Sequence, residues 1–131
     1  MKAFILLLIS VCCAFGQQQD DNLKDVEKII GYIAESNFKD AASLLNERYS
    51  PWTPDDVKES LIDSMRQLGN EKIIGKFNGH EIVKDKSFGK SVRTIGTILK
   101  YDRQPIYLSF DFYNPDGKEW ILIGLYLQSD R

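Results

Sequence analysis

The sequence predicts an α+β domain, in which N-terminal helices pack against a curved, four-stranded antiparallel sheet. Two observations indicate this class. Up to Gly69, apolar residues recur at spacings of three and four, which is the period of an amphipathic helix. After Gly69, apolar residues alternate with polar ones, which is the period of a strand. Helices followed by a run of strands are typical of an α+β domain.

Three helices are expected before Gly69. An apolar stripe from Leu23 to Ile33 predicts the first, and Ser36-Asn37 interrupts the pattern. A short second helix is expected over residues 38–45, followed by a connector over residues 49–52. Thr53-Pro54-Asp55-Asp56 then combines an N-cap residue, a proline at the first helical position and two acids that favour the helix dipole. The third helix is therefore expected to run from this start to Gly69.

Four strands are expected after Gly69, with turns between them. The first is uneven and broken by glycines, and residues 85–90 form the turn that follows it. Asn114-Pro115-Asp116-Gly117 is a strong turn signal before the last strand. The expected strands are Lys72 to Val83, Val92 to Tyr101, Ile106 to Tyr113 and Trp120 to Gln128.

The last two strands differ in how their apolar residues alternate. On the third strand, one face carries Ile106, Leu108, Phe110 and Phe112, and the other carries Tyr107, Ser109, Asp111 and Tyr113. The fourth strand is apolar on both faces, with Ile121, Ile123, Leu125 and Leu127 on one and Trp120, Leu122 and Tyr126 on the other. Twist or a bulge can exchange these faces, so neither set is assigned to the interior. A strand that is wet on one side alternates more cleanly, so we expect the second face to be covered, most simply by a homodimer.

The first sixteen residues have the layout of a secretory signal peptide. Lys2 precedes an apolar run that is too short to span a bilayer, and Ala14-Phe15-Gly16 supplies small residues at a cleavage site. Cleavage after Gly16 would remove both cysteines, leaving a disordered segment at 17–22 and a single domain at 23–131. We expect a periplasmic or secreted protein. A lipid-anchored form is less favoured, because Val11 rather than a small residue precedes Cys12.

Charge excludes some classes of partner. The net charge of −2 becomes −3 without Lys2, and a mildly acidic chain lacks the dense basic surface that nucleic acid requires. It also lacks a polybasic segment for anionic lipid, so no stable membrane insertion is expected after signal cleavage.

The order of elements resembles the nuclear transport factor 2-like superfamily, also called cystatin-like. The resemblance rests on Leu68-Gly69 at a helix end, the strand from Ile106 to Phe112, and Trp120 to Leu125 in the last strand. It covers roughly Leu23 to Gln128 and is nearest to small exported bacterial domains of unknown function. It implies a cone-shaped fold with a cavity between helices and sheet. It assigns no catalytic residues, although some members are isomerases or hydrolases with Asp and Tyr in the cone.

Two residues are candidates for catalysis. Asp111 lies mid-strand between aromatic residues, where burial would raise the pKa of a carboxyl group and favour a general base. Its parity instead favours a solvent-side aspartate that pairs with Arg93 or Lys100 across the strands. His80 is the only histidine, and a surface position on a strand is the favoured interpretation of it. No metal site or cofactor is expected, since a zinc site would need further ligands.

Aromatic residues are the candidates for ligand binding. Rings with polar tips can line a ligand pocket, but they are also ordinary core and interface residues. The candidates are Tyr49, Trp52, Tyr107, Tyr113, Trp120 and Tyr126.

The expected function is that of an exported, non-catalytic binding domain for a small apolar ligand or a protein partner. The alternative is a cofactor-independent enzyme, isomerase- or hydrolase-like, that uses a carboxylate in the cone. The alternative requires a carboxylate pointing into an enclosed cavity, so the position of Asp111 discriminates between the two.

Overall fold

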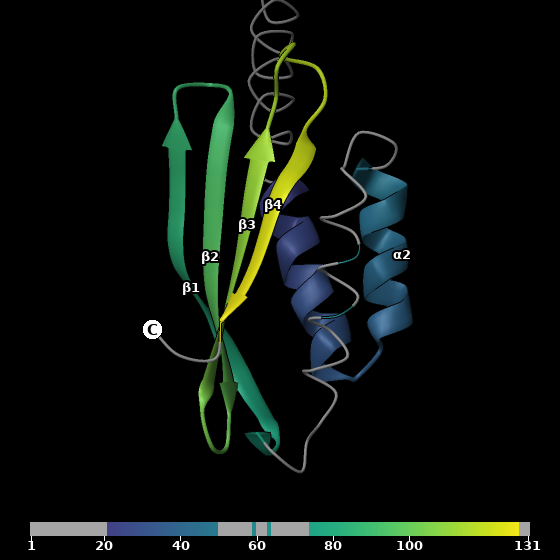
Figure 1. Ribbon diagram of the computed structural model, residues 1–131, viewed down its shortest axis with the longest axis vertical. Helices are drawn as coiled ribbons and strands as arrows, with labels where there is room; N and C mark the ends of the chain where they lie inside the picture. The colour runs from purple at the N-terminus through teal and green to yellow at the C-terminus, as the bar shows by residue number, and fades with distance from the viewer. Residues whose placement is uncertain (1–20, 50–58, 60–62, 64–73, 129–131) are drawn as a thin grey trace, which may run out of the picture.

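The computed structural model describes residues 21–49, 59, 63 and 74–128. A helix over residues 21–34 is followed by α2 and then by an antiparallel sheet with strand order β1-β2-β3-β4 (Figure 1). The elements are α2 (Phe38–Tyr49), β1 (Phe77–Phe88), β2 (Val92–Tyr101), β3 (Pro105–Tyr113) and β4 (Ile121–Gln128). Helices before an antiparallel meander confirm the α+β class.

The two described helices agree with the predicted ones, although α2 is longer. It ends at Tyr49, which the sequence placed in a connector, because this residue continues the buried stripe of Ala41 and Leu45. Ser36, with a φ of 56°, makes the turn between the helices, and Asn37 caps α2 by accepting a hydrogen bond from the Asp40 amide. The predicted third helix lies outside the described residues except for two exposed positions, 59 and 63, which are both helical.

The signal peptide at 1–16 and most of the segment at 17–22 also lie outside the described residues. No helix within the described part of the chain is long and apolar enough to cross a bilayer.

The first strand was predicted wrongly. It begins at Phe77 rather than at residue 72, and it continues to Phe88 through the stretch that was predicted to be a turn. The pairing with β2 shifts register between Ile82 and Lys84, so the polar residues after the shift remain in the ladder. β1 is an edge strand, where charged side chains and bulges are common because they discourage pairing with another chain.

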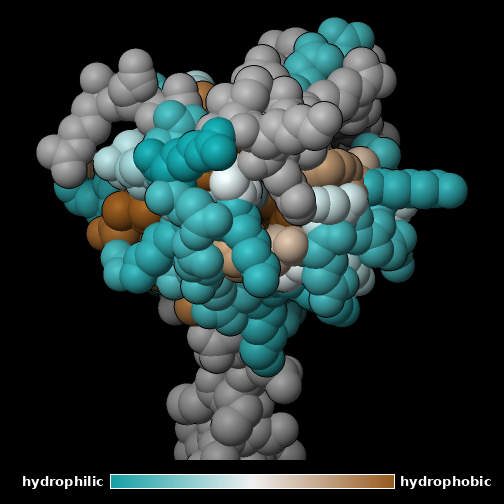
Figure 2. All heavy atoms as spheres, turned by 90° about the horizontal axis from the view of Figure 1, so that it is seen from below, coloured by the Kyte–Doolittle hydropathy of each residue, from teal (hydrophilic) through white to brown (hydrophobic). Residues whose placement is uncertain are grey.

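One face of the sheet is buried beneath the helices, which lie together on one side of it (Figure 1). The predicted apolar face of β3 is confirmed as the core face. Tyr49 of α2 reaches this face, and its ring centroid is 5.4 Å from that of Phe112. The side chains at the centre of the core are Val26, Ile29, Ile30, Ile95, Leu99, Leu108, Phe110, Phe112 and Leu122. Seen from below, hydrophilic residues cover most of the described surface and hydrophobic ones show only in separate places (Figure 2).

A bulge in β4 decides which of its residues reach the core. Asp111 pairs with Gly124, whereas the next residue, Phe112, pairs with Leu122, so Ile123 is an extra residue in the ladder. As a result, Leu122 and Leu125 are both buried, while Ile123 is 43% exposed. The core face of β4 therefore takes residues from both sets that strict alternation would separate.

We expect the ion pair between Asp85 and Arg93 to make stability depend on pH. Arg93 Nη2 lies 2.7 Å from Asp85 Oδ2, and this hydrogen bonding lowers the pKa of Asp85. A lowered folded-state pKa contributes stability above the unfolded pKa of about 4, and the contribution is lost as pH falls through the folded pKa. The difference in unfolding free energy between wild type and Asp85→Asn should therefore be largest near neutral pH and shrink in acid.

Urea denaturation across this pH range measures that difference. Glu47→Gln, at an exposed position of α2, is the control and should show no such trend. A difference for Asp85→Asn that stays constant down to acid pH would contradict the role of the pair.

Candidate functional site

The face of the sheet turned away from the helices, here called the outer face, carries a row of exposed and half-buried apolar side chains. Successive pairings place Phe88 beside Val92, Val92 beside Tyr113 and Tyr113 beside Ile121. We call these four residues the apolar row. Phe88 is 51% exposed and Tyr113 is 37% exposed, so the row lies open to solvent in a single copy of the chain.

A hollow of about 360 Å³, here called the outer hollow, lies beside the apolar row. Small residues leave room for it at the middle of the sheet, where Gly96 pairs with Ser109. A Cβ atom on Gly96 would lie 3.2 Å from Lys84 Cβ, so any larger residue would intrude there. The lining residues are Lys84, Phe88, Thr94, Tyr107, Ser109, Asp111, Tyr126 and Gln128.

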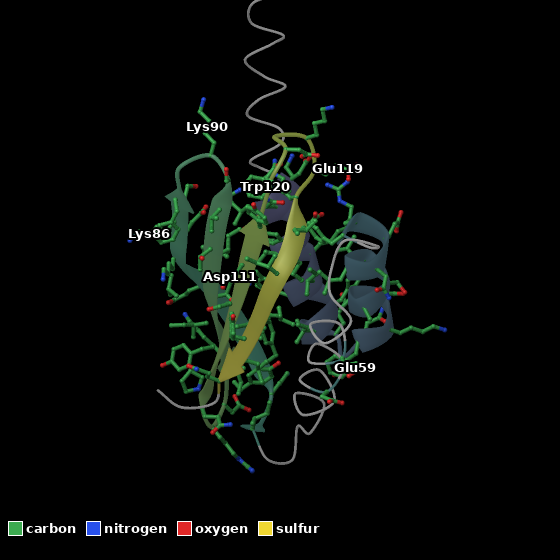
Figure 3. All side chains as sticks on the ribbon, turned by 45° about the horizontal axis from the view of Figure 1, so that its top comes forward. Glu59, Lys86, Lys90, Asp111, Glu119 and Trp120 are labelled. Carbon is green, nitrogen blue, oxygen red and sulfur yellow. The ribbon has the colours of Figure 1, made fainter. Side chains whose placement is uncertain are left out.

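Asp111 is half-buried in this hollow near the middle of the sheet (Figure 3). Thr94 Oγ1 donates a hydrogen bond to Asp111 Oδ1 at 2.7 Å, which fixes the carboxylate. No described residue donates to Asp111 Oδ2. The predicted pairing with Arg93 or Lys100 is wrong.

Arg93 and Lys100 bind other carboxylates because of where they lie on β2. Arg93 lies on the core side of β2 and bonds Asp85. Lys100 Nζ lies 2.6 Å from Glu81 Oε1 on the neighbouring strand. Thr94, the direct cross-strand neighbour of Asp111, is the residue that reaches it.

The aromatic candidates divide between the two sides of the sheet. Tyr107 and Tyr126 line the outer hollow. Tyr113 belongs to the apolar row, and Trp120 is half-buried just before β4 at the end of the sheet (Figure 3). Tyr49 is buried on the helix side. Trp52 lies outside the described residues.

His80 is exposed on β1 and does not line the outer hollow. The described residues include no group of three or more His, Cys, Asp or Glu side chains that could hold a metal ion. The outer hollow therefore offers hydrogen-bonding and aromatic groups for binding, with Asp111 as its one carboxylate.

A partly buried polar cluster between the helices was not predicted. The Tyr49 hydroxyl donates to Asp25 Oδ2 at 2.8 Å, and Arg48 Nε donates to the same oxygen at 3.2 Å. Burial, followed by the charge of Asp25, raises the pKa of Tyr49, so its hydroxyl keeps its proton and acts as a donor. The sequence did contain an indication that Asp25 is buried. Asp25 precedes Ile29 by four residues and so lies on the buried stripe of the helix.

Comparison with protein-family models gives no match, and no curated protein is detectably similar to the chain. The outer face and the helix cluster must therefore be interpreted from their own chemistry.

We expect Tyr49→Phe to destabilise the protein by about 1–3 kcal/mol, because it removes a donor from a buried carboxylate. Tyr32→Phe is the matched control, since Tyr32 is half-buried and its hydroxyl bonds to no described residue. The control should change stability by less than about 0.5 kcal/mol. Urea denaturation measures the unfolding free energy of both variants. Equal losses in the two would show that the hydrogen bond of the Tyr49 hydroxyl does not stabilise the protein.

Gly124→Ala should displace the ring of Tyr126. An added Cβ atom would lie 2.8 Å from Tyr126 Cε2, and the flexible side chain must move to avoid it. Nuclear Overhauser contacts between the Tyr126 ring and the backbone of residue 124 should therefore weaken in the variant. Their persistence at full strength would contradict the placement of this ring.

Gly31→Ala is the control for the same chemical change. A Cβ atom at this helical position would meet nothing within 4 Å, so the substitution should stabilise the protein by about 0.5–1 kcal/mol. The contacts of Tyr126 should be unaffected by it.

Proposed function

We propose that the chain is an exported, non-catalytic binding domain that takes a small, partly apolar molecule in the outer hollow. The observation that carries the proposal is the hollow itself, with glycine and serine at the sheet and aromatic side chains around it. Its volume of about 360 Å³ falls in the usual range of small-molecule sites, roughly 300–1,000 Å³.

The lining suggests the chemistry of the molecule. Tyr107, Tyr126 and Phe88 offer ring surface to an apolar or aromatic group. The free Oδ2 of Asp111 can accept a hydrogen bond from a hydroxyl or an amine of the ligand. The small apolar ligand expected from the sequence is thus narrowed to one that also carries a hydrogen-bond donor.

Binding is favoured over catalysis by the setting of Asp111. The enzyme alternative needs a carboxylate in an enclosed cavity between helices and sheet, whereas Asp111 lies in an outer-face hollow. Asp25, a buried carboxylate on the helix side, is occupied by Tyr49 and Arg48.

Amide NMR with two probes tests the site. Indole supplies an aromatic ring, and tryptamine adds an amine that can bond Asp111. We expect both to shift the signals of Gly96, Ser109 and Gly124, with tryptamine binding more tightly. Ser109→Trp should abolish these shifts by filling the hollow, while Ser43→Trp, at an exposed position on α2, should preserve them. Shifts confined to the helix-side core, or unchanged by Ser109→Trp, would overturn the proposal.

A further inference from the structure

We propose that a second copy of the chain covers the outer face, related by a two-fold axis that runs parallel to the strands between β2 and β3. This inference rests on the strand register and on charge, and it does not depend on what occupies the outer hollow. The register arranges the outer face in four rows, each crossing all four strands. The apolar row is the first. The others are Lys86-Thr94-Asp111-Gly124, Lys84-Gly96-Ser109-Tyr126 and Glu81-Ile98-Tyr107-Gln128.

The proposed axis keeps each row opposite the same row of the second copy. It exchanges β1 with β4 and β2 with β3, so Phe88 faces Ile121 of the second copy and Val92 faces Tyr113. The apolar row then buries itself against its own equivalent. An axis running across the strands would instead bring the apolar row onto the end of the sheet that carries Glu81 and Lys100, which would leave charges against apolar groups.

The same axis brings opposite charges together. Asp111 of one copy comes to lie opposite β2 of the other, one strand away from Lys86 and Lys84 on β1. The described residues give neither lysine a carboxylate partner, and Lys86 Nζ lies 4.8 Å from the ring centroid of Phe88. Two symmetric contacts between Asp111 and the β1 lysines would fix the register of the pair.

The face supplies a large part of the area that a dimer interface needs. Four strands of about eight residues present roughly 500 Å² in projection, given spacings of about 4.8 Å between strands and 3.3 Å along them. Protruding side chains such as Phe88 and Tyr126, each more than half exposed, raise the accessible area above this value. A standard interface buries about 800 Å² per partner.

A second copy also completes the outer hollow. Gly96 and Ser109 lie on the two strands that flank the axis, so the two hollows meet there. The hollow, which is open in one chain, becomes a shared chamber between two sheets. Sheets that pack face to face lie about 10 Å apart, which leaves space above the small residues.

Charge exchange tests the arrangement. Asp111→Lys sets lysines against lysines in a homodimer, and the double variant Lys84→Glu/Lys86→Glu sets glutamates against Asp111. Each should dimerise at least about tenfold more weakly than wild type, since like charges in an interface are strongly unfavourable. An equimolar mixture restores opposite charges at both contacts and should form heterodimers with nearly wild-type affinity.

Sedimentation equilibrium measures the affinities, and native mass spectrometry identifies the heterodimer. Lys39→Glu and Glu47→Lys, exposed on α2, are the control reversals and should leave dimerisation unchanged. Tyr113→Asp places a charge in the apolar row and should abolish the dimer. It is the alternative variant if Asp111→Lys does not fold.

Wild-type protein that stays monomeric up to its solubility limit would overturn the dimer. So would a mixture that dimerises no better than its two components. A monomer that still binds indole in the outer hollow would contradict the dimer and leave the proposed function standing.

Discussion

The arrangement of both sheet faces depends on the bulge at Ile123. Without it, strict alternation would place Ile121, Ile123, Leu125 and Leu127 on one face, and the pairing of Phe110 with Leu125 shows that this face would be the core. The extra residue lets Leu122 pack opposite Phe112 while Leu125 and Leu127 stay opposite Phe110 and Leu108. One local irregularity thereby puts Leu122 instead of Ile123 opposite Phe112 and removes Ile123 from the interior.

The bulge also shapes the outer face. On one side of it the regular pairing puts Gly124 beside Asp111 and Tyr126 beside Ser109, so a ring borders a floor of small residues. On the other side, the bulge brings Ile121 rather than Leu122 in line with Tyr113, which completes the apolar row across the sheet. The two proposals use these consequences in different ways: the hollow offers a site to a small molecule, and the rows offer a self-complementary surface to a second copy. On the opposite side, the bonds of Asp25 to Tyr49 and Arg48 tie the two helices together above the core.

The parts that sequence could predict are those governed by local periodicity. The bounds of β2 were predicted as observed, and the core face of β3 followed from parity alone. The end of β1 was missed because an edge strand tolerates polar residues that resemble a turn. The site was foreseen only in part. Asp111 was identified, but its partner Thr94 depends on pairing between strands distant in sequence, and the position of the bulge depends on packing against β3. The periodicity of the sequence indicates neither the partner of Asp111 nor the position of the bulge.

The direct test of this account is the pattern of backbone nuclear Overhauser contacts between β3 and β4. The account predicts cross-strand contacts for the pairs Asp111–Gly124 and Phe112–Leu122, with no pair formed by Ile123. A regular ladder in which Asp111 or Phe112 pairs with Ile123 would contradict it. In that case the core face of β4 and the rows of the outer face would have to be reassigned.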